Sequence, residues 1–300
     1  MEKPFLLHMF TPAKNLSPFD VNMAFDAGWD HIIPYLSVEA AEVTGLVQDA
    51  IFSRGPKGAR RTGVFLGGRD IHLATEMMKI ARDAMFPPFE VSVFADPSGA
   101  FTTGAAMVAK VEAALQARHG LGLEGQRILV FGGTGPVGST AAVLAAQAGA
   151  QVTLVGHAGI EAPRAAAERC AERYGVSLEA ADGSSAERKA ALLKDADIVL
   201  AAAAAGVQVL DRALVEQAVA LKVAADVNAV PPAGIEGIGA QDDGEPLAGS
   251  PAEAVGIGAL AVGNLKYQVQ QQLLRRMREA DSPQYLGFAE ALEIGREHVG

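Results

Sequence analysis

The sequence predicts an α/β protein of two domains, of which the second is a doubly wound parallel sheet. Short aliphatic runs alternate with longer alanine-rich stretches, a pattern typical of parallel strands joined by helices. The chain has 300 residues, which at roughly 100 to 200 residues per domain indicates about two domains. A glycine-rich turn at 133–138 follows an expected strand and opens an expected helix. The 33 glycines and 15 prolines are spread along the chain, which indicates many tight turns.

In the first part of the chain, β-branched and aromatic runs alternate with helical stretches. We expect strands at 5–10, 31–35, 62–67 and 91–95, and helices at 18–27, 38–52, 71–85 and 101–119. The first helix has the clearest start, because Ser17 can cap it, Pro18 suits its first position and Asp20 stands where a capping-box acid would. The glycine-rich residues 120–125 then break the pattern.

After this break the alternation continues more sharply. We expect strands at 127–131, 151–155, 176–180, 198–203 and 223–227, and helices at 136–148, 161–174 and 257–280. The strand ending at Val227 leads through Asn228 to Pro231 and Pro232, whose missing N–H groups stop a strand ladder. Residues 242–251 are expected to be a mobile polar loop.

The composition excludes several classes of protein. Half of the residues are hydrophobic, and 25 Lys+Arg against 35 Asp+Glu give a net charge of −10, which disfavours binding to nucleic acid. The longest apolar runs are too short to cross a membrane, which needs roughly 20 residues. A lone cysteine, Cys170, cannot form an internal disulfide, so we expect a cytoplasmic protein. The six histidines show no metal-ligand spacing, so we expect no metal site.

The turn after the strand at 127–131 has the spacing of a dinucleotide-binding loop. Its residues are Gly133, Thr134, Gly135, Pro136, Val137 and Gly138. Glycines at the first two positions permit a tight turn and close approach to a pyrophosphate, and the third lets the helix pack on the strand. The helix N-terminus then offers free N–H groups to the phosphates. An ordinary glycine-rich turn is the alternative, and the order of strand, turn, helix and second strand favours the nucleotide.

The end of the second strand bears on the choice of coenzyme. An NAD site usually places Asp or Glu there to hold the ribose 2′-OH, but this chain reads Val155-Gly156-His157-Ala158-Gly159. Without a carboxylate to repel a 2′-phosphate, we expect NADP, or both NADP and NAD, to bind, with His157 and Arg164 as donors. His157 could equally be a surface histidine. Ala203 and Asn228, near the ends of later strands, complete the expected coenzyme contacts.

Five segments that occur in order along the chain carry the pattern of one enzyme family. They are Ser17-Pro-Phe-Asp20-Val-Asn22, Asp96-Pro-Ser-Gly99-Ala-Phe-Thr102-Thr103, the turn ending at Gly138, Ala225-Asp226-Val-Asn228-Ala-Val-Pro231-Pro232 and Gly256-Ile-Gly258-Ala-Leu-Ala-Val-Gly263-Asn-Leu-Lys266. With these segments the chain resembles the bacterial NAD(P)-dependent methylene-tetrahydromethanopterin dehydrogenases. It is more similar to the branch that accepts NAD and NADP than to the strictly NADP-dependent, folate-tolerant branch.

The resemblance implies an activity and an organisation. The activity is oxidation of a methylene-tetrahydropterin to the methenyl cation in the formaldehyde oxidation of methylotrophic bacteria, with hydride passing to NAD(P). The implied domains are a pterin domain of residues 1–120 plus 257–300 and an NAD(P)-binding Rossmann domain of residues 121–256, with the active site in a cleft between them. The resemblance also implies a homo-oligomer, a trimer or a multiple of one.

Hydride leaves a carbon flanked by two nitrogens in this reaction, so no proton is transferred and no general acid or base is required. The protein must align the carbon and supply a field that tolerates a forming positive charge. A carboxylate would supply that field, and Asp20 is the first candidate and Asp96 the second. Each has a structural alternative, because Asp20 can cap its helix and Asp96 can bond the backbone of its own turn.

The other expected site residues rest on the resemblance and on position. Lys266 is expected to be catalytic, although a lone lysine on a helix is more often solvated. The expected substrate contacts are Phe19, Asp96, Thr102, Thr103 and Asn228. Thr102 could instead be an N-cap, and Asn228 a turn residue. The basic loop from Arg54 to Arg61 is either solvated or a partner for the acidic tail of a pterin.

Rival functions remain open. The bifunctional methylene-tetrahydrofolate dehydrogenase and cyclohydrolase carries a Tyr-x-x-x-Lys in its N-terminal half, whereas Tyr35 here is followed at that spacing by Glu39, so cyclohydrolase activity is not expected. Short-chain dehydrogenases carry their glycine motif at the N-terminus, which this chain does not. A methylene-tetrahydrofolate dehydrogenase and a non-catalytic NAD(P) sensor are the alternatives.

Overall fold

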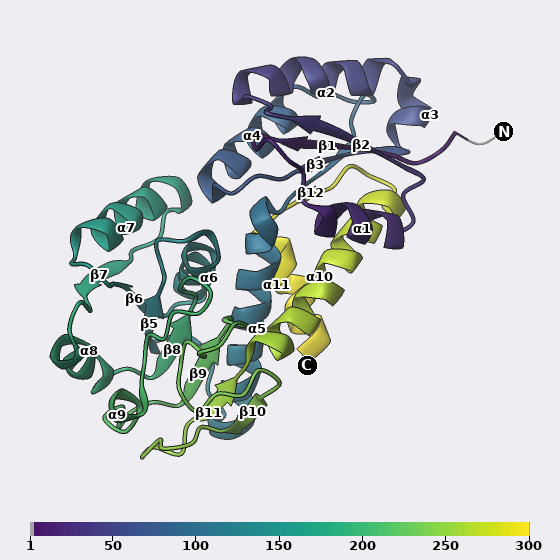
Figure 1. The fold of residues 1–300 in the computed structure, drawn as a ribbon. Coiled ribbons are helices and arrows are strands. Elements are labelled where there is room, and N and C mark those ends of the chain that lie inside the picture. The colour runs from purple at the N-terminus through teal and green to yellow at the C-terminus, as the bar shows by residue number, and fades with distance from the viewer. Residues whose placement is uncertain (1–2, 300) are drawn as a thin grey trace. The chain divides into compact units, whose positions relative to one another are not determined.

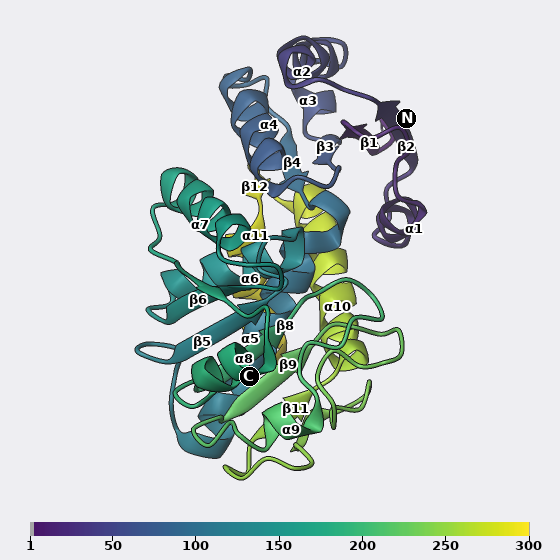
Figure 2. The same ribbon diagram turned by 60° about the vertical axis from the view of Figure 1, so that its left-hand side comes forward.

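The chain folds into two compact α/β units in a computed structural model that describes residues 3–299. The first unit comprises the residues up to 102 together with 267–294, and the second comprises 103–266 together with the residues after 294. The two divisions near 102 and 266 fall inside the long helices α5 (Ala100–His119) and α10 (Ala259–Glu279), whereas the family resemblance implies domain boundaries at 120 and 257. Figures 1 and 2 label these elements.

The first unit contains a five-stranded parallel sheet in the order β12-β4-β3-β1-β2. The strands are β1 (Leu6–Thr11), β2 (His31–Leu36), β3 (Thr62–Leu66), β4 (Ser92–Ala95) and β12 (Tyr285–Leu286). Strands β3 and β4 are buried along their whole length, as continuous apolar runs in a parallel sheet should be. The last strand, β12, brings a late segment of the chain to the edge of the first sheet.

Helices cover both faces of this sheet. They are α1 (Pro18–Asp26), α2 (Val43–Phe52), the short α3 (Gly55–Ala59), α4 (Ile71–Asp83) and α11 (Phe288–Val299), with single 3₁₀ turns at Ala40–Glu42 and Pro97–Gly99. Helices α2 and α4 lie on one side of the strands, and α1 and the later part of α10 lie on the other (Figure 1).

The later part of α10 packs closely on the first sheet. A side chain at Gly63 in β3 would lie 2.6 Å from the Trp29 ring and 3.1 Å from Met277 of α10. Trp29 also donates from Nε1 to the backbone oxygen of Leu274, at 3.2 Å. Gly63 therefore lets the C-terminal part of the chain become part of the N-terminal unit.

The second unit has the doubly wound sheet that the sequence predicts. Its seven strands lie in the order β10-β11-β9-β8-β5-β6-β7, and all neighbouring pairs are parallel except β10 with β11. They are β5 (Arg127–Phe131), β6 (Gln151–Gly156), β7 (Glu179–Asp182), β8 (Ile198–Ala201), β9 (Val223–Asp226), β10 (Asp243–Pro246) and β11 (Val255–Ile257). Strand order reverses between β5 and β8, and this is where such sheets bind ligands.

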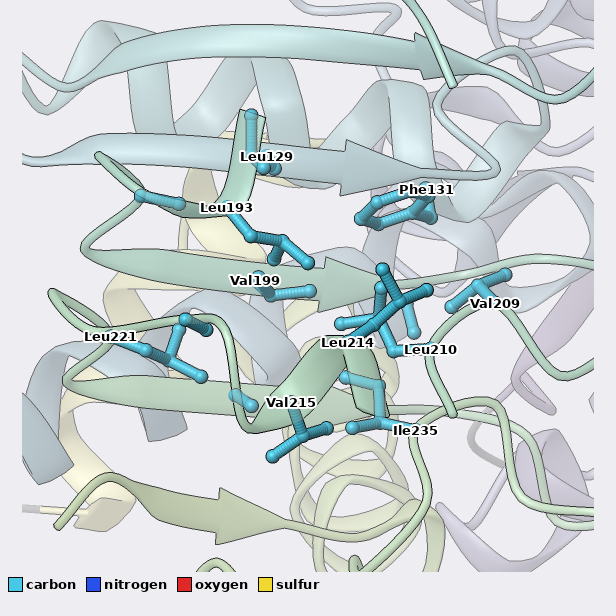
Figure 3. Packing of buried hydrophobic residues seen from close by; sticks show 14 of the residues in the cluster. Leu129, Phe131, Leu193, Val199, Val209, Leu210, Leu214, Val215, Leu221 and Ile235 are labelled. Atoms are coloured by element: carbon cyan, nitrogen blue, oxygen red, sulfur yellow. The ribbon is translucent and has the colours of Figure 1, made fainter. Parts of the chain in front are cut away.

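Helices again cover both faces of the sheet. They are α6 (Pro136–Gln147), α7 (Glu161–Tyr174), α8 (Ala186–Leu193) and α9 (Arg212–Val215). Figure 3 shows one core layer, in which Leu193 of α8 and Leu214 and Val215 of α9 pack against Val199 and Phe131 of the sheet. Early in α5, Gly104 has no room for a side chain beside Thr140 of α6, so these two helices are in close contact.

Several expected elements differ from the structure. The expected helix at 38–52 begins with a 3₁₀ turn, and the strand expected at 176–180 lies at Glu179–Asp182, after Gly175 ends α7 in a left-handed conformation. The loop expected at 242–251 is wrong in part, because Asp243–Pro246 forms the antiparallel strand β10. The helix expected from 257 starts at Ala259, because Ile257 still pairs with Ala225 of β9. Strands β11 and β12 and helices α3, α8, α9 and α11 were not anticipated.

Acidic residues occupy both edge strands of the second sheet. Strand β7 contains Glu179 and Asp182, and β10 contains Asp243 and Glu245. Lys110 of α5 donates to Asp243 at 2.6 Å, which ties the β10 edge to the helix. Strand β10 is short, lies antiparallel to its neighbour and ends in a proline, so the sheet stops there.

A buried acid joins the amino ends of three neighbouring strands. Asp197, just before β8, accepts from the backbone N–H of Arg127 at 2.8 Å and from Lys222 Nζ at 2.5 Å. Burial alone would raise the pKa of Asp197, but the hydrogen bonds from Lys222 and Arg127 hold it below its usual value. A lowered pKa stabilises the fold above the unfolded-state pKa, and this stabilisation is lost as pH falls through the folded-state value.

We expect Asp197→Asn to lower the free energy of unfolding at neutral pH by about 1.5 to 3 kcal/mol, the range for hydrogen bonds to charged groups. The loss relative to the unchanged protein should shrink as pH falls below about 4, because the unchanged carboxyl is then protonated as well. Urea unfolding at a series of pH values measures this difference. A difference that stays constant from neutral to acidic pH would contradict it.

Candidate functional site

The turn between β5 and α6 leaves no space for side chains. Gly132 has φ +77°, and a Cβ there would overlap the backbone oxygen of Ala202, which follows β8. A Cβ at Gly138 would overlap the backbone oxygen of Gly132. Gly135 is the N-cap of α6 and Pro136 stands in its first turn. The turn thus runs close to the neighbouring loop and presents the N-terminus of α6 at the carboxyl edge of the sheet.

The glycines of this turn do not have the roles that the sequence pattern predicts for them. The tight turn with positive φ belongs to Gly132, which the sequence analysis did not include, whereas Gly133 packs against Leu154 of β6, 2.7 Å from a Cβ built on it. Ser139 Oγ donates to the backbone oxygen of Gly133 at 2.7 Å and fixes the turn further. The sequence contains two successive glycines, Gly132 and Gly133, and this pair could have indicated that the tight turn begins at Gly132.

A pocket of about 430 Å³ opens beside this turn. Its walls come from the turn, from the carboxyl ends of β6 and β7, and from the segment after β8. Its lining includes Gly132, Thr134, Gly135, His157, Gly183, Lys189 and Ala203. Gly133, Pro136, Val137, Gly138 and Asn228 were expected at the coenzyme and are not part of this lining; Gly133 and Gly138 shape the turn from behind.

The pocket wall at the end of β6 contains no carboxylate. It consists of Gly156, His157, Ala158 and Gly159, with Ala162 and Pro163 of α7 beside them. His157 is exposed. Arg164, expected as a second donor, directs its guanidinium to Glu161 at 3.1 and 3.3 Å and does not line the pocket.

Lys189 of α8 is the lysine that lines this pocket, and the sequence analysis missed it. Its Nζ donates to the backbone oxygen of Val209 at 2.7 Å and lies 5.9 Å from the centre of the Phe131 ring. Burial lowers the pKa of Lys189, and Asp211 opposes this by raising it. Ser185 before Ala-Glu-Arg is an N-cap signal for α8. No local feature of the sequence shows that Lys189 of this helix points into the pocket.

The pocket fits a dinucleotide. Without side chains at Gly132 and Gly138, the turn runs close to the segment after β8, and Gly135, the N-cap of α6, lines the pocket. Free backbone N–H groups and the positive end of the helix dipole at such a position suit a pyrophosphate. The apolar walls, from Phe131, Val155 and Val207, suit an adenine ring.

A second pocket, of about 480 Å³, lies at the carboxyl ends of the strands of the first sheet. Thr11 ends β1, Gly67 follows β3 and Ser98 follows β4. Between them the pocket is lined by the segment from Ala13 to Pro18 and by Asp20, Gly68 and Arg69. Two exposed cations, Lys14 and Arg69, stand at this pocket in an otherwise acidic protein.

Asp20 is buried in the wall of the second pocket. It is 4% exposed and accepts a hydrogen bond at 2.8 Å from Gln270 Nε2 of α10, which is fully buried. The expected cap is correct in its backbone, because Ser17 is the N-cap and Pro18 follows it, but the Ser17 side chain makes no capping hydrogen bond. The structure thus assigns Asp20 a contact 250 residues away in sequence, which no local pattern could reveal.

The loop after β4 gives Asp96 a structural role. Its carboxylate accepts from the backbone N–H groups of Phe101 and Thr102 at 3.0 and 3.2 Å and from Thr102 Oγ1 at 2.7 Å. Both Asp96 and Thr102 are fully buried, so the acid caps the start of α5. Thr103 is partly buried in the same turn, and Phe19 is 47% exposed at the start of α1.

The basic loop lies at the opposite edge of the first sheet from this pocket. It precedes β3, whereas the pocket follows β3, and a parallel sheet separates these two edges. Arg54 donates to the backbone oxygens of Pro4 and Arg61 and to Thr62 Oγ1, and Arg61 stacks on Phe5 at 3.9 Å. Of the two readings of this loop, the structure favours a structural one, in which it ties the strand starts together.

Asn228 organises the loop after β9. Its Oδ1 accepts from the backbone N–H groups of Gly206 and Val230, and its Nδ2 donates to the backbone oxygen of Pro232. Asp226, 2% exposed, accepts from the N–H groups of Asn228 and Ile235. Burial raises the pKa of Asp226, while these backbone donors lower it. A smaller pocket of about 170 Å³ is lined by both residues.

Two further residues considered in the sequence, Lys266 and Cys170, are both buried. Lys266 is 9% exposed on α10, so it is not the solvated lysine that its position on a helix alone would favour. Cys170 is buried in α7, and burial raises the pKa of its thiol.

Residues 3–299 contain no group of three His, Cys, Asp or Glu side chains arranged to hold a metal ion. Every helix in that range is too short or too polar to cross a bilayer.

Comparison with known proteins gives one consistent family. Residues 18–98 match the family described as methylene-tetrahydromethanopterin dehydrogenase, N-terminal. The chain is 50% identical over 295 residues to the NAD(P)-dependent methylenetetrahydromethanopterin dehydrogenase of Methylorubrum extorquens, covering 98% of this chain and 99% of that protein. It is 34% identical over 289 residues to the bifunctional protein MdtA of the same organism, covering 96% of each.

Solved structures show the same fold at low sequence identity. Shikimate 5-dehydrogenase from Listeria monocytogenes, solved with shikimate and NAD, has a TM-score of 0.52 at 14% identity, over 97% of this chain and 96% of that chain. An NAD-dependent malic enzyme from Thermotoga maritima has a TM-score of 0.57 at 13% identity, over 97% and 84%. These likenesses confirm the expected fold class of two α/β units, the second Rossmann-like.

We expect Gly132→Ala to weaken nucleotide binding at least tenfold and to destabilise the fold, because the methyl group would overlap Ala202 and the positive φ would be strained. Calorimetric titration with NADP and thermal unfolding measure the two effects. Gly45→Ala is the matched control: Gly45 is helical with open space around it, so alanine there should stabilise the helix, by up to about 1 kcal/mol. Unchanged NADP affinity in Gly132→Ala would refute the assignment of the turn.

Proposed function

We propose that this chain, which belongs to the family of NAD(P)-dependent methylenetetrahydromethanopterin dehydrogenases, removes a hydride from methylene-tetrahydromethanopterin and delivers it to NAD(P). The product is the methenyl cation, in a one-carbon oxidation sequence. The observation in the structure that supports this best is Asp20, a buried carboxylate held by Gln270 in a pocket at the carboxyl edge of the first sheet.

The residues of the second unit support the coenzyme half of the proposal. Gly132 to Gly138 and the start of α6 would hold the pyrophosphate, and the wall from Gly156 to Gly159 would hold the adenosine ribose. Ala203 and the apolar side chains around it would contact the adenine. When bound, NAD(P) supplies the carbon that accepts the hydride.

The residues of the first unit support the pterin half. Asp20 supplies negative charge that favours the forming methenyl cation, and because it is buried its field is weakly screened. Gln270 fixes the carboxylate in place, so no reorganisation is required when the charge forms. Phe19 offers an aromatic face for the pterin ring. Thr103 and Lys266 remain proposed contacts, whereas Asp96, Thr102 and Asn228 act through the loops that they order.

An assay of coenzyme reduction tests the proposed function directly. Mixing the protein with methylene-tetrahydromethanopterin and NADP should raise absorbance in the reduced nicotinamide band, and NAD should also serve. Binding of NADP without reduction would favour a non-catalytic sensor instead. A higher kcat/KM with methylene-tetrahydrofolate would favour the folate enzyme, which oxidises the same kind of carbon. A strong preference for NAD over NADP would contradict the coenzyme assignment.

The proposal also covers the cellular location and the oligomeric state of the enzyme. We place it in the cytoplasm, where NAD(P) and reduced pterin coenzymes are found, and fractionation of cells tests this. We also propose a homo-oligomer, a trimer or a multiple of one, following the family resemblance; sedimentation of the purified protein tests it, and a monomer at working concentrations would contradict it.

We expect Asp20→Asn to lower kcat by about 100-fold or more, because it removes the charge that favours the cation while keeping the shape of the side chain. The KM for the pterin should change much less. Asp26→Asn is the matched control, since Asp26 lies in the same helix and is exposed. Single-turnover kinetics separate the hydride step from product release. A kcat unchanged by Asp20→Asn would remove this carboxylate from the mechanism.

We expect Lys14→Met and Arg69→Met each to raise the KM for methylene-tetrahydromethanopterin about tenfold with little change in kcat, because each removes a cation from the pocket that would receive an acidic coenzyme. Lys57→Met, at the opposite edge of the same sheet, should leave KM unchanged. Steady-state kinetics at two salt concentrations measures these effects. Equal KM changes in all three variants would show a diffuse charge effect rather than binding in the pocket.

A further inference from the structure

The pocket beside α6 contains one cationic side chain whose task neither the turn nor the pterin explains. Lys189 enters the lining from α8, whereas the other lining residues are glycines, alanines, apolar side chains, Thr134, His157 and Gln208. No Asp or Glu is among the residues that line it in the described chain. A charged amine in an otherwise neutral pocket is a binding group for an anion.

The stem of Lys189 passes the position where an adenosine ribose lies in this kind of sheet. Gly156 at the end of β6 pairs with Asp182 at the end of β7, and the N–H of Gly183 donates to Gly156 at 2.8 Å. A Cβ built on Gly183 would lie 3.6 Å from Lys189 Cγ. The lysine therefore leaves the backbone beside the carboxyl ends of β6 and β7, where the ribose hydroxyls bind.

The charges around Lys189 leave its ammonium group available to a ligand. Asp182, the acid at the end of β7, forms an ion pair with Arg188. Asp211 raises the pKa of Lys189 but has its own hydrogen bond, from the backbone N–H of Leu214 as the cap of α9. Lys189 Nζ donates to a neutral group, the backbone carbonyl of Val209. Since an ammonium group has three donors, it can keep this contact and still bind a phosphate.

We infer that Lys189 is the group that recognises the 2′-phosphate of NADP in this pocket. This inference rests on the proposed function, because it takes the pocket to be the NAD(P) site. It assigns to a lysine of α8 the role for which the sequence offered His157 and Arg164, of which the second is engaged by Glu161. NAD can still bind, because the lysine then remains on the Val209 carbonyl.

The alternative role of Lys189 is structural, since its bond to Val209 ties α8 to the segment after β8. The two roles predict different results with two small ligands. Adenosine 2′,5′-bisphosphate carries the 2′-phosphate and adenosine 5′-monophosphate lacks it. A structural change in the pocket wall weakens both ligands equally, whereas loss of a 2′-phosphate contact weakens only the first.

Calorimetric titration of the full-length protein with these two nucleotides tests the inference without any catalytic turnover. We expect Lys189→Met to raise the Kd for adenosine 2′,5′-bisphosphate about tenfold to a hundredfold, the range for a charge-assisted hydrogen bond, and to change the Kd for adenosine 5′-monophosphate less than about twofold. Lys194→Met, an exposed lysine at the end of the same helix, should change neither.

A second variant separates charge from packing. Lys189→Gln keeps a donor for the Val209 carbonyl but loses the charge, so it should show the same selective loss, while Lys189→Arg should retain most of the affinity. Equal loss for both nucleotides, or no loss for either, would overturn the assignment of Lys189. Failure of the unchanged protein to bind either nucleotide would instead contradict the NAD(P) site, and with it the proposed function.

Discussion

The close approach of two backbone segments governs the coenzyme half of this molecule. The turn after β5 touches the segment after β8 at a place where neither Gly132 nor Gly138 can carry a side chain. This contact brings the N-terminus of α6 to the point where strand order reverses, and it positions Ala202 and Ala203 across the pocket from the turn. Once these segments meet, the sheet determines where the regions proposed for the phosphate, adenine and ribose lie.

The second unit was largely predictable because its signals are local. A buried aliphatic strand, a run of glycines and a helix that begins with proline are contiguous, so the sequence shows them in order. The boundaries were less accurate where a tertiary contact extends or shortens an element, as with β11, which delays the start of α10. The sequence of strand β10 predicts a polar loop, because its acids, glycine and proline have low strand propensity and do not alternate with apolar residues.

The candidate sites were predictable in part. Asp20 was identified from the reaction that the family resemblance implies, but its partner Gln270 comes from the far end of the chain, and contacts of this kind leave no periodic signal. Lys189 was missed because its helix, α8, was not anticipated, and only the fold shows that this side chain turns toward the pocket. Asp96 had two expected roles, a contact to the substrate or a bond to the backbone of its own turn, and the structure shows it bonded to the backbone N–H groups of Phe101 and Thr102 at the start of α5.

The acidic edges of the second sheet have a consequence for how copies of this protein meet. An exposed strand edge is a template for pairing with another chain. Here both edges carry carboxylates, Glu179 and Asp182 on one and Asp243 and Glu245 on the other, so two copies that approach edge to edge bring like charges together. Carboxylates on these strands therefore disfavour the growth of continuous sheets through either edge, a route that would end in aggregation.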